Sequence, residues 1–104
     1  MRFSPDELAP LRRDLLARGQ TLATLLVELM AGKQPTAVEA LVDAHPGLRP
    51  AEVLRLELDH IEARRMLLDA DDDRFGRCDI CGVDLGLAAL REMPWADRCS
   101  SHAR

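Results

Sequence analysis

The residues that decide the fold are Cys78-Asp79-Ile80-Cys81 and, after a gap of seventeen residues, Cys99-Ser100-Ser101-His102. This C-x-x-C…C-x-x-H pattern uses all three cysteines of the chain. Each short spacing lets two side chains turn back onto one metal ion, and two such pairs complete the tetrahedron that Zn²⁺ prefers. The pattern therefore predicts one structural Zn²⁺, bound by the three cysteines and His102. Four protein ligands leave no open position for water, so we expect no enzyme activity.

The composition is typical of amphipathic helices. Of 104 residues, 47% are apolar and 31% are charged, but only 3% are aromatic. Such a chain suits one domain, or a helical unit with a small appended module, and argues against a β-sandwich or barrel. Because few aromatic residues make a thin core, we expect the metal to contribute to stability.

The charge balance favours a protein partner over a nucleic acid. The formal net charge is −4, and the 14 basic residues are spread among 18 acidic ones. Nucleic-acid binding normally needs a clustered positive face. We therefore expect no direct sequence-specific DNA binding.

The sequence also indicates a compartment. No stretch approaches the apolar length of a membrane span, and the start of the chain turns acidic at Asp6 and Glu7 instead of forming the apolar run of a signal peptide. Cysteines at metal-ligand spacing without an export signal are typical of a reducing compartment. The expectation is a cytoplasmic protein that does not contact a membrane.

Two long helices are predicted from leucine and isoleucine repeats, at about 5–31 and 50–72. The first begins with an S-x-x-E capping box at Ser4 and Glu7 and ends before Gly32, and the second begins at Pro50. Apolar residues recur every seven positions in both, at Leu8, Leu15, Leu22 and Leu29, and at Leu54, Ile61 and Leu68.

A short third helix is predicted between them, at about 37–45. Thr36 and Glu39 suggest a second capping box, and His45-Pro46-Gly47 ends the segment. The predicted fold class is therefore mainly α: an antiparallel, coiled-coil-like helical hairpin with a short extra helix (residues 1–73), followed by a C-terminal zinc finger (residues 74–104). In this arrangement the finger lies beside the N-terminus.

The segments Phe75–Leu85 and Leu90–Cys99 resemble the finger of the DksA/TraR family. That family reads aromatic-G-x-C-x-x-C-G, then L-x-x-x-P-x-A-x-x-C-x-x-C, with the same seventeen-residue gap. His102 stands where the family has its fourth cysteine, and Cys₃His still suits tetrahedral zinc. The sequence ends two residues after His102, so the C-terminal helix common in the family is not expected.

The resemblance implies a regulator that binds bacterial RNA polymerase without catalysis. Family members insert the hairpin tip, with its D-x-x-D-x-A motif, into the polymerase secondary channel. Residues 33–50 contain no such motif. The nearest acids are Glu39 and Asp43, each followed by alanine and four positions apart, so they would share one helix face. They are the candidates for a divergent partner-binding tip.

Two other functions stay open at this point. The chain could be a zinc-stabilised adaptor or homodimer that reuses the fold without the tip function, because fold does not determine function. It could also be a thiol-based redox or zinc switch that releases its metal on oxidation.

Overall fold

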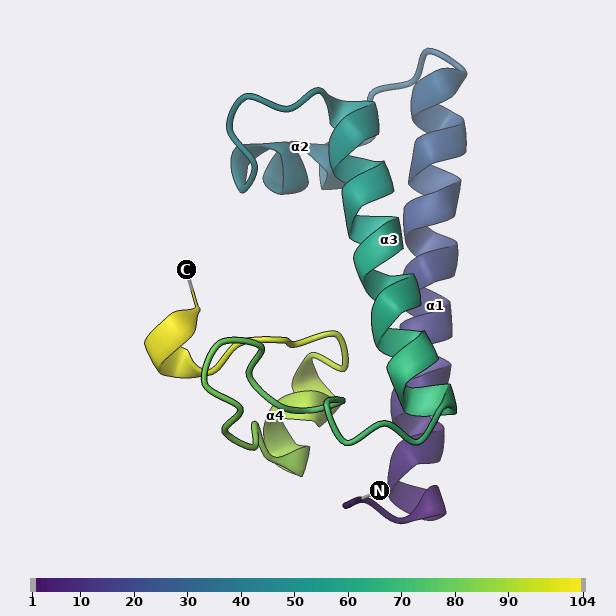
Figure 1. Cartoon of the computed structure of the whole chain (residues 1–104). Helices are drawn as coiled ribbons and strands as arrows, with labels where there is room; N and C mark the ends of the chain where they lie inside the picture. Colours follow the sequence, from purple (N-terminus) through teal and green to yellow (C-terminus); the bar gives the residue numbers. More distant parts are fainter. Residues whose placement is uncertain (1, 104) are drawn as a thin grey trace. The chain divides into compact units, whose positions relative to one another are not determined.

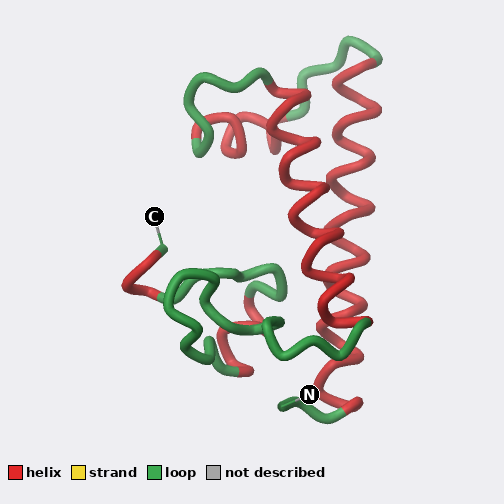
Figure 2. The backbone as a smooth tube through the Cα atoms, viewed as in Figure 1, coloured by secondary structure: helices red, strands yellow, loops and turns green. Residues whose placement is uncertain are grey.

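The computed structural model describes residues 2–103, which form helices and loops (Figure 1). Within these residues there is no strand, and the backbone is coloured only as helix and loop in Figure 2. A single antiparallel bridge joins Arg77 and Asp84. The mainly helical fold class is confirmed. The elements are α1 (Pro5–Met30), α2 (Thr36–Asp43), α3 (Pro50–Asp69), α4 (Leu87–Glu92) and a 3₁₀ turn, η1 (Ser100–His102).

The chain divides into two compact units. One combines the residues up to Leu16 with those from Ala63 onward, and the other is Ala17–Glu62. The long helices α1 and α3 contribute a segment to each unit. We call these the finger unit and the α2 unit. The predicted domain boundary at residue 73 stays a prediction, because each of the two compact units contains part of both long helices.

In the finger unit, α1 begins as the sequence predicted. The backbone N–H of Ser4 donates to Glu7 Oε1 at 2.8 Å, and the N–H of Glu7 donates to Ser4 Oγ at 3.2 Å. This reciprocal pair satisfies two N–H groups that a helix start leaves without partners. Arg12 Nε then donates to Asp69 Oδ1 at 2.7 Å and joins α1 to α3. The buried apolar core of this unit is Leu8, Leu11, Leu15, Leu68, Phe75 and Leu90.

In the α2 unit, α1 and α3 run antiparallel. Gly19 lies opposite Ile61, since a Cβ on this glycine would be 3.6 Å from the Ile61 side chain, and Leu29 shares a groove with Pro50. The α1 helix ends with Gly32 in the left-handed region (φ 87°), as predicted. The buried core here is Leu22, Val38, Val53, Leu54 and Ile61. His45 Nε2 lies 2.8 Å from Glu57 Oε1 and ties the loop after α2 to α3.

Three details of the helix ends differ from the sequence prediction. The short helix α2 ends at Asp43, two residues before the predicted end at 45, because Ala44 and His45 form a turn with N–H bonds to the carbonyls of Ala40 and Val42. The second capping box is wrong: α2 starts at Thr36 itself, and Pro35 is the N-cap residue, with no side-chain hydrogen bond. The other long helix ends at Asp69, three residues before the predicted end at 72. Asp71 adopts a left-handed conformation (φ 56°), and the N–H of Asp72 donates to the Leu67 carbonyl at 3.0 Å, which closes the helix.

Candidate metal centre

The structure brings the four predicted metal ligands together. Cys78 and Cys81 lie on the loop between α3 and α4, Cys99 directly precedes η1, and His102 is the last residue of η1. Their four ligand atoms all lie within 4.8 Å of one another. Cys78 is buried, Cys81 is exposed, and the other two are half-buried, so the cluster lies at the edge of the finger unit.

The spacing of these atoms fits a tetrahedral zinc ion. Zinc–sulfur bonds of about 2.3 Å place two tetrahedral sulfur ligands roughly 3.8 Å apart. Cys81 Sγ lies 3.8 Å from Cys99 Sγ, and Cys78 Sγ lies 3.7 Å from His102 Nδ1. Cys99 Sγ lies 3.2 Å from His102 Nδ1. The imidazole therefore faces the sulfur atoms through Nδ1, and the donor set is the soft sulfur and nitrogen set that Zn²⁺ prefers.

The backbone around Cys78 forms the tight turn that such a ligand pair needs. The N–H of Gly82 donates to the Cys78 carbonyl at 2.9 Å, and the N–H of Cys78 donates to the Val83 carbonyl at 2.9 Å. The N–H of Asp79 donates to the Asp97 carbonyl at 2.8 Å. This last bond joins the loop of the first ligand pair to the segment that leads into the second pair.

The same turn favours a thiolate at Cys78. Burial acts to raise the pKa of this thiol, but the backbone N–H groups of Cys81, Cys99 and Ile80 outweigh it and lower the pKa to about 6. At Cys81 the N–H of Val83 acts to lower the pKa, but burial and the neighbouring sulfur atoms outweigh it, so the pKa of this thiol is raised. Because the thiolate is the form that binds metal, Cys78 is already suited to a cation near neutral pH.

The N-terminal segment holds the finger through Arg2, a residue for which the sequence suggested no role. Arg2 Nε donates to Asp84 Oδ2 at 2.8 Å, and Nη1 and Nη2 donate to the carbonyls of Asp73 and Phe75. The N–H of Gly86, and then the Arg2 guanidinium, lower the pKa of Asp84. The prediction that the finger lies beside the N-terminus is confirmed, although no local sequence signal identifies Arg2 as the contact.

Arg64 is a second residue that sequence reasoning missed. It lies in the predicted helix among exposed acids, yet its exposed fraction is only 6%. Its Nη2 donates to both carboxylate oxygens of Asp79, at 3.0 and 3.3 Å. Asp79 lies between the first two cysteines, so α3 contacts the metal-ligand loop directly.

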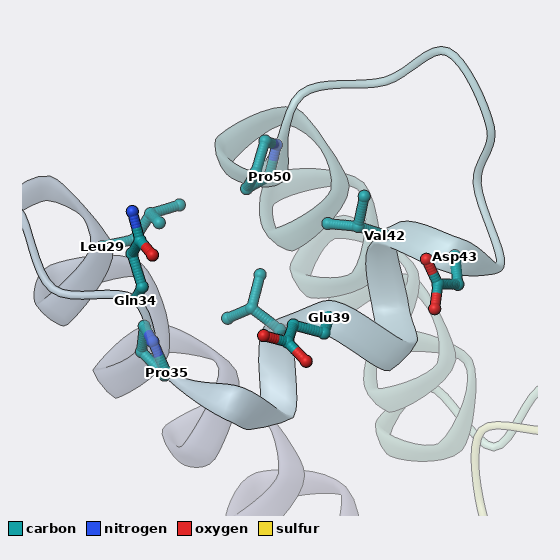
Figure 3. A pocket seen from close by; sticks show the side chains of 8 residues that line it. Leu29, Gln34, Pro35, Glu39, Val42, Asp43 and Pro50 are labelled. Carbon is teal, nitrogen blue, oxygen red and sulfur yellow. The ribbon is translucent and has the colours of Figure 1, made fainter.

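The tip candidates Glu39 and Asp43 lie in the α2 unit. Both are exposed on α2 and line a groove of about 320 Å³. Figure 3 shows the side chains of Leu29, Val42 and Pro50 around the same space, one from each helix of this unit. The two carboxylates lie on one face of α2, and apolar side chains line the groove beside them.

A helix long and apolar enough to cross a membrane is not found among residues 2–103.

The fold and the cluster together define a class: a helical hairpin protein with a Cys₃His zinc-finger-type module. The chain is similar to the RNA polymerase-binding transcription factor DksA of Haemophilus influenzae, with 42% identity over 52 residues. The aligned part covers 50% of this chain and 34% of that protein, so it spans about a third of its length. This similarity and the Cys₃His cluster fit the DksA/TraR C4-type zinc-finger family, with His102 at the position of the fourth cysteine. No protein-family model matches the chain, and no solved structure matches it.

Proposed function

We propose that this protein is a DksA-like transcription regulator that binds bacterial RNA polymerase in the cytoplasm and catalyses no reaction. The observation that carries the proposal is the 42% identity to a factor whose name states that it binds RNA polymerase. The Cys₃His cluster supports it, because four protein ligands suit a structural ion and leave no position for a substrate. The acidic net charge of −4 also favours a protein partner over direct, sequence-specific DNA binding.

The metal in this proposal is one structural Zn²⁺, bound by Cys78, Cys81, Cys99 and His102. The finger unit has a small apolar core, so the bound ion would supply a large part of the stability of its C-terminal segment. Removing the ion with a chelator should therefore unfold the segment around the ligands while much of α1 and α3 stays helical. Circular dichroism with metal analysis measures both effects.

The partner-binding surface in this proposal is the groove beside α2. Glu39 and Asp43 place two negative charges at its rim, while Val38 and Val42 supply apolar surface. Such a surface suits an apolar side chain of the polymerase that is flanked by basic residues. We therefore assign Glu39 and Asp43 as the residues that contact the polymerase, in place of a D-x-x-D-x-A motif.

A pull-down with purified bacterial RNA polymerase tests the proposal. The wild-type protein should bind, and the double variant Glu39→Ala/Asp43→Ala should lose binding or its effect on transcription. The control variant, Glu52→Ala/Asp59→Ala, removes the same charge from two exposed acids of α3 in the same unit. If the wild type does not bind polymerase, the proposed function is wrong. If both double variants behave like the wild type, only the assignment of the groove is wrong.

A further inference from the structure

Arg64 carries an unusual combination of charge and burial. Its side chain is 7% exposed, and Nη2 is bonded to Asp79. Within residues 2–103, the Nε and Nη1 atoms are buried and have no hydrogen-bond partner. A guanidinium is charged at every physiological pH, and a buried donor without a partner is disfavoured, so this arrangement needs a compensating group.

Solvent is not that group, because the two nitrogen atoms are inaccessible to it. The neighbouring arginines have their own partners: Arg74 is bonded to Asp72, and Arg77 donates to the carbonyls of Asp73 and Gly82. Arg64 also has a partner in Asp79, but unlike Arg74 and Arg77 it keeps two buried donor atoms without one among the described residues. Asp79 pairs with one side of the Arg64 guanidinium, and the Nε–H and Nη1–H groups on the other side are buried without a partner in residues 2–103.

Besides Asp79, the hollow that Arg64 lines also reaches the predicted metal centre. Arg64 and Cys78 line one hollow of about 510 Å³ in the finger unit, and Cys78 is the most buried of the four ligands. Zinc bound by three thiolates and a neutral imidazole carries one net negative charge. A buried guanidinium beside this centre offsets the charge without requiring a direct bond to sulfur.

We propose that Arg64 is the positioning residue and counter-ion of the zinc centre. Its charge stabilises the zinc–thiolate cluster, and its hydrogen bond to Asp79, which an asparagine oxygen can also accept, orients the loop between Cys78 and Cys81. The inference rests on the zinc occupancy proposed above. It makes α3 part of the metal site, because metal affinity then depends on a residue that no ligand pattern contains.

A purely structural role for Arg64 predicts something different. Asp79 is 47% exposed in its side chain, and its backbone N–H bonds the carbonyl of Asp97. If Arg64 served only to hold Asp79, removing either partner would loosen the loop equally. If Arg64 is a counter-ion, removing the Asp79 charge takes an anion away from a negatively charged centre and does not weaken metal binding.

The experiment measures the zinc dissociation constant of the full chain by competition with a chromophoric chelator. Arg64→Met should weaken zinc binding by about 10–100-fold, the usual cost of losing a group that supports a metal ligand. Arg64→Lys should restore most of the affinity because it keeps the charge. Asp79→Asn should bind zinc at least as tightly as the wild type. Arg65→Met, which changes the neighbouring residue on α3, is the matched control and should leave the affinity unchanged.

Replacement of zinc by Co²⁺ gives a second readout. The sulfur-to-cobalt charge-transfer band should shift in Arg64→Met, because the band reports the electron density on the thiolates. In Arg64→Lys the band should lie at its wild-type position. Equal weakening by Arg64→Met and Asp79→Asn, or wild-type affinity in Arg64→Met, overturns the inference. If Arg64→Met does not fold, as judged by circular dichroism, weakened binding in Asp79→Asn overturns it alone. If the wild type binds no zinc, the metal proposal is overturned as well. If Arg64→Met binds zinc with wild-type affinity, only the role of Arg64 is overturned.

Discussion

Replacing Gly76 with alanine tests how closely the finger packs against the N-terminal segment. Gly76 is buried and has a φ of 78°. A Cβ at this position would lie 2.9 Å from Leu90 Cδ1, 3.0 Å from Arg2 Nη2 and 3.2 Å from the Phe3 ring. Leu90 is fully buried and has little room to move. Alanine here therefore adds both backbone strain and a steric clash.

The magnitude follows from adding these two effects. A left-handed backbone costs an alanine about 1–2 kcal/mol, and overpacking a core adds about 1–3 kcal/mol. Gly86 provides the matched control: its φ is 86°, but no described atom lies within 4 Å of a Cβ built there. Gly86→Ala should show the backbone cost alone. The free energy of unfolding of Gly76→Ala should thus be lower than that of Gly86→Ala by about 1–3 kcal/mol.

Urea denaturation followed by circular dichroism, at a fixed excess of zinc, measures both variants under the same conditions. The fixed zinc concentration matters because a bound metal adds to the apparent stability of the folded state. Equal losses of stability in the two variants would refute the close packing around Gly76. A larger loss in Gly86→Ala would refute it more strongly.

Three further perturbations test individual contacts. Ser4→Ala removes the side-chain acceptor of the Glu7 N–H, which also donates to the Ser4 carbonyl, and should cost about 1 kcal/mol in thermal denaturation; an unchanged melting temperature contradicts the cap. Asp71→Gly relieves a left-handed aspartate at the end of α3 and should stabilise the chain by about 0.5–1 kcal/mol; a loss of stability contradicts this. The carboxyl of Asp84 should titrate below its ordinary pKa in carbon-13 NMR, because the Gly86 N–H and Arg2 favour its charged form. Its contribution to stability is present above the ordinary pKa and is lost as the pH falls through the lowered one, so Asp84→Asn should matter less in acid.

The sequence predicted those parts of the fold that depend on periodicity and spacing. Leucines that recur every seven residues need burial along one stripe, and Leu8, Leu15 and Leu22 are buried as this requires. The ligand cluster was predictable for the same kind of reason. The x-x spacing of each pair leaves few ways to satisfy one tetrahedral ion, and the structure places the four ligand atoms together.

Residues whose partners are distant in the chain were not predictable. Arg64 has a helical, charged neighbourhood that indicates an exposed position, and only the folded loop places Asp79 beside it. The prediction for the start of α2 was wrong for a local reason. Pro35 has the extended conformation of an N-cap residue (φ −62°, ψ 134°). Thr36 is therefore the first helical residue and not the cap. The predicted end of α3 was wrong because Asp71 adopts the left-handed conformation that glycine usually provides at a helix end.

The contact between Arg2 and Asp84 has a consequence for how the chain folds during synthesis. These residues are 82 positions apart, and the finger unit combines the start of the chain with the residues from Ala63 onward. At a translation rate of about 5–20 residues per second, Arg2 waits roughly 4–16 seconds for its carboxylate partner to be made. The α2 unit, Ala17–Glu62, is continuous and can pack as soon as its residues leave the ribosome. Residues 2–16 are therefore synthesised before the α2 unit but can complete their packing only after it.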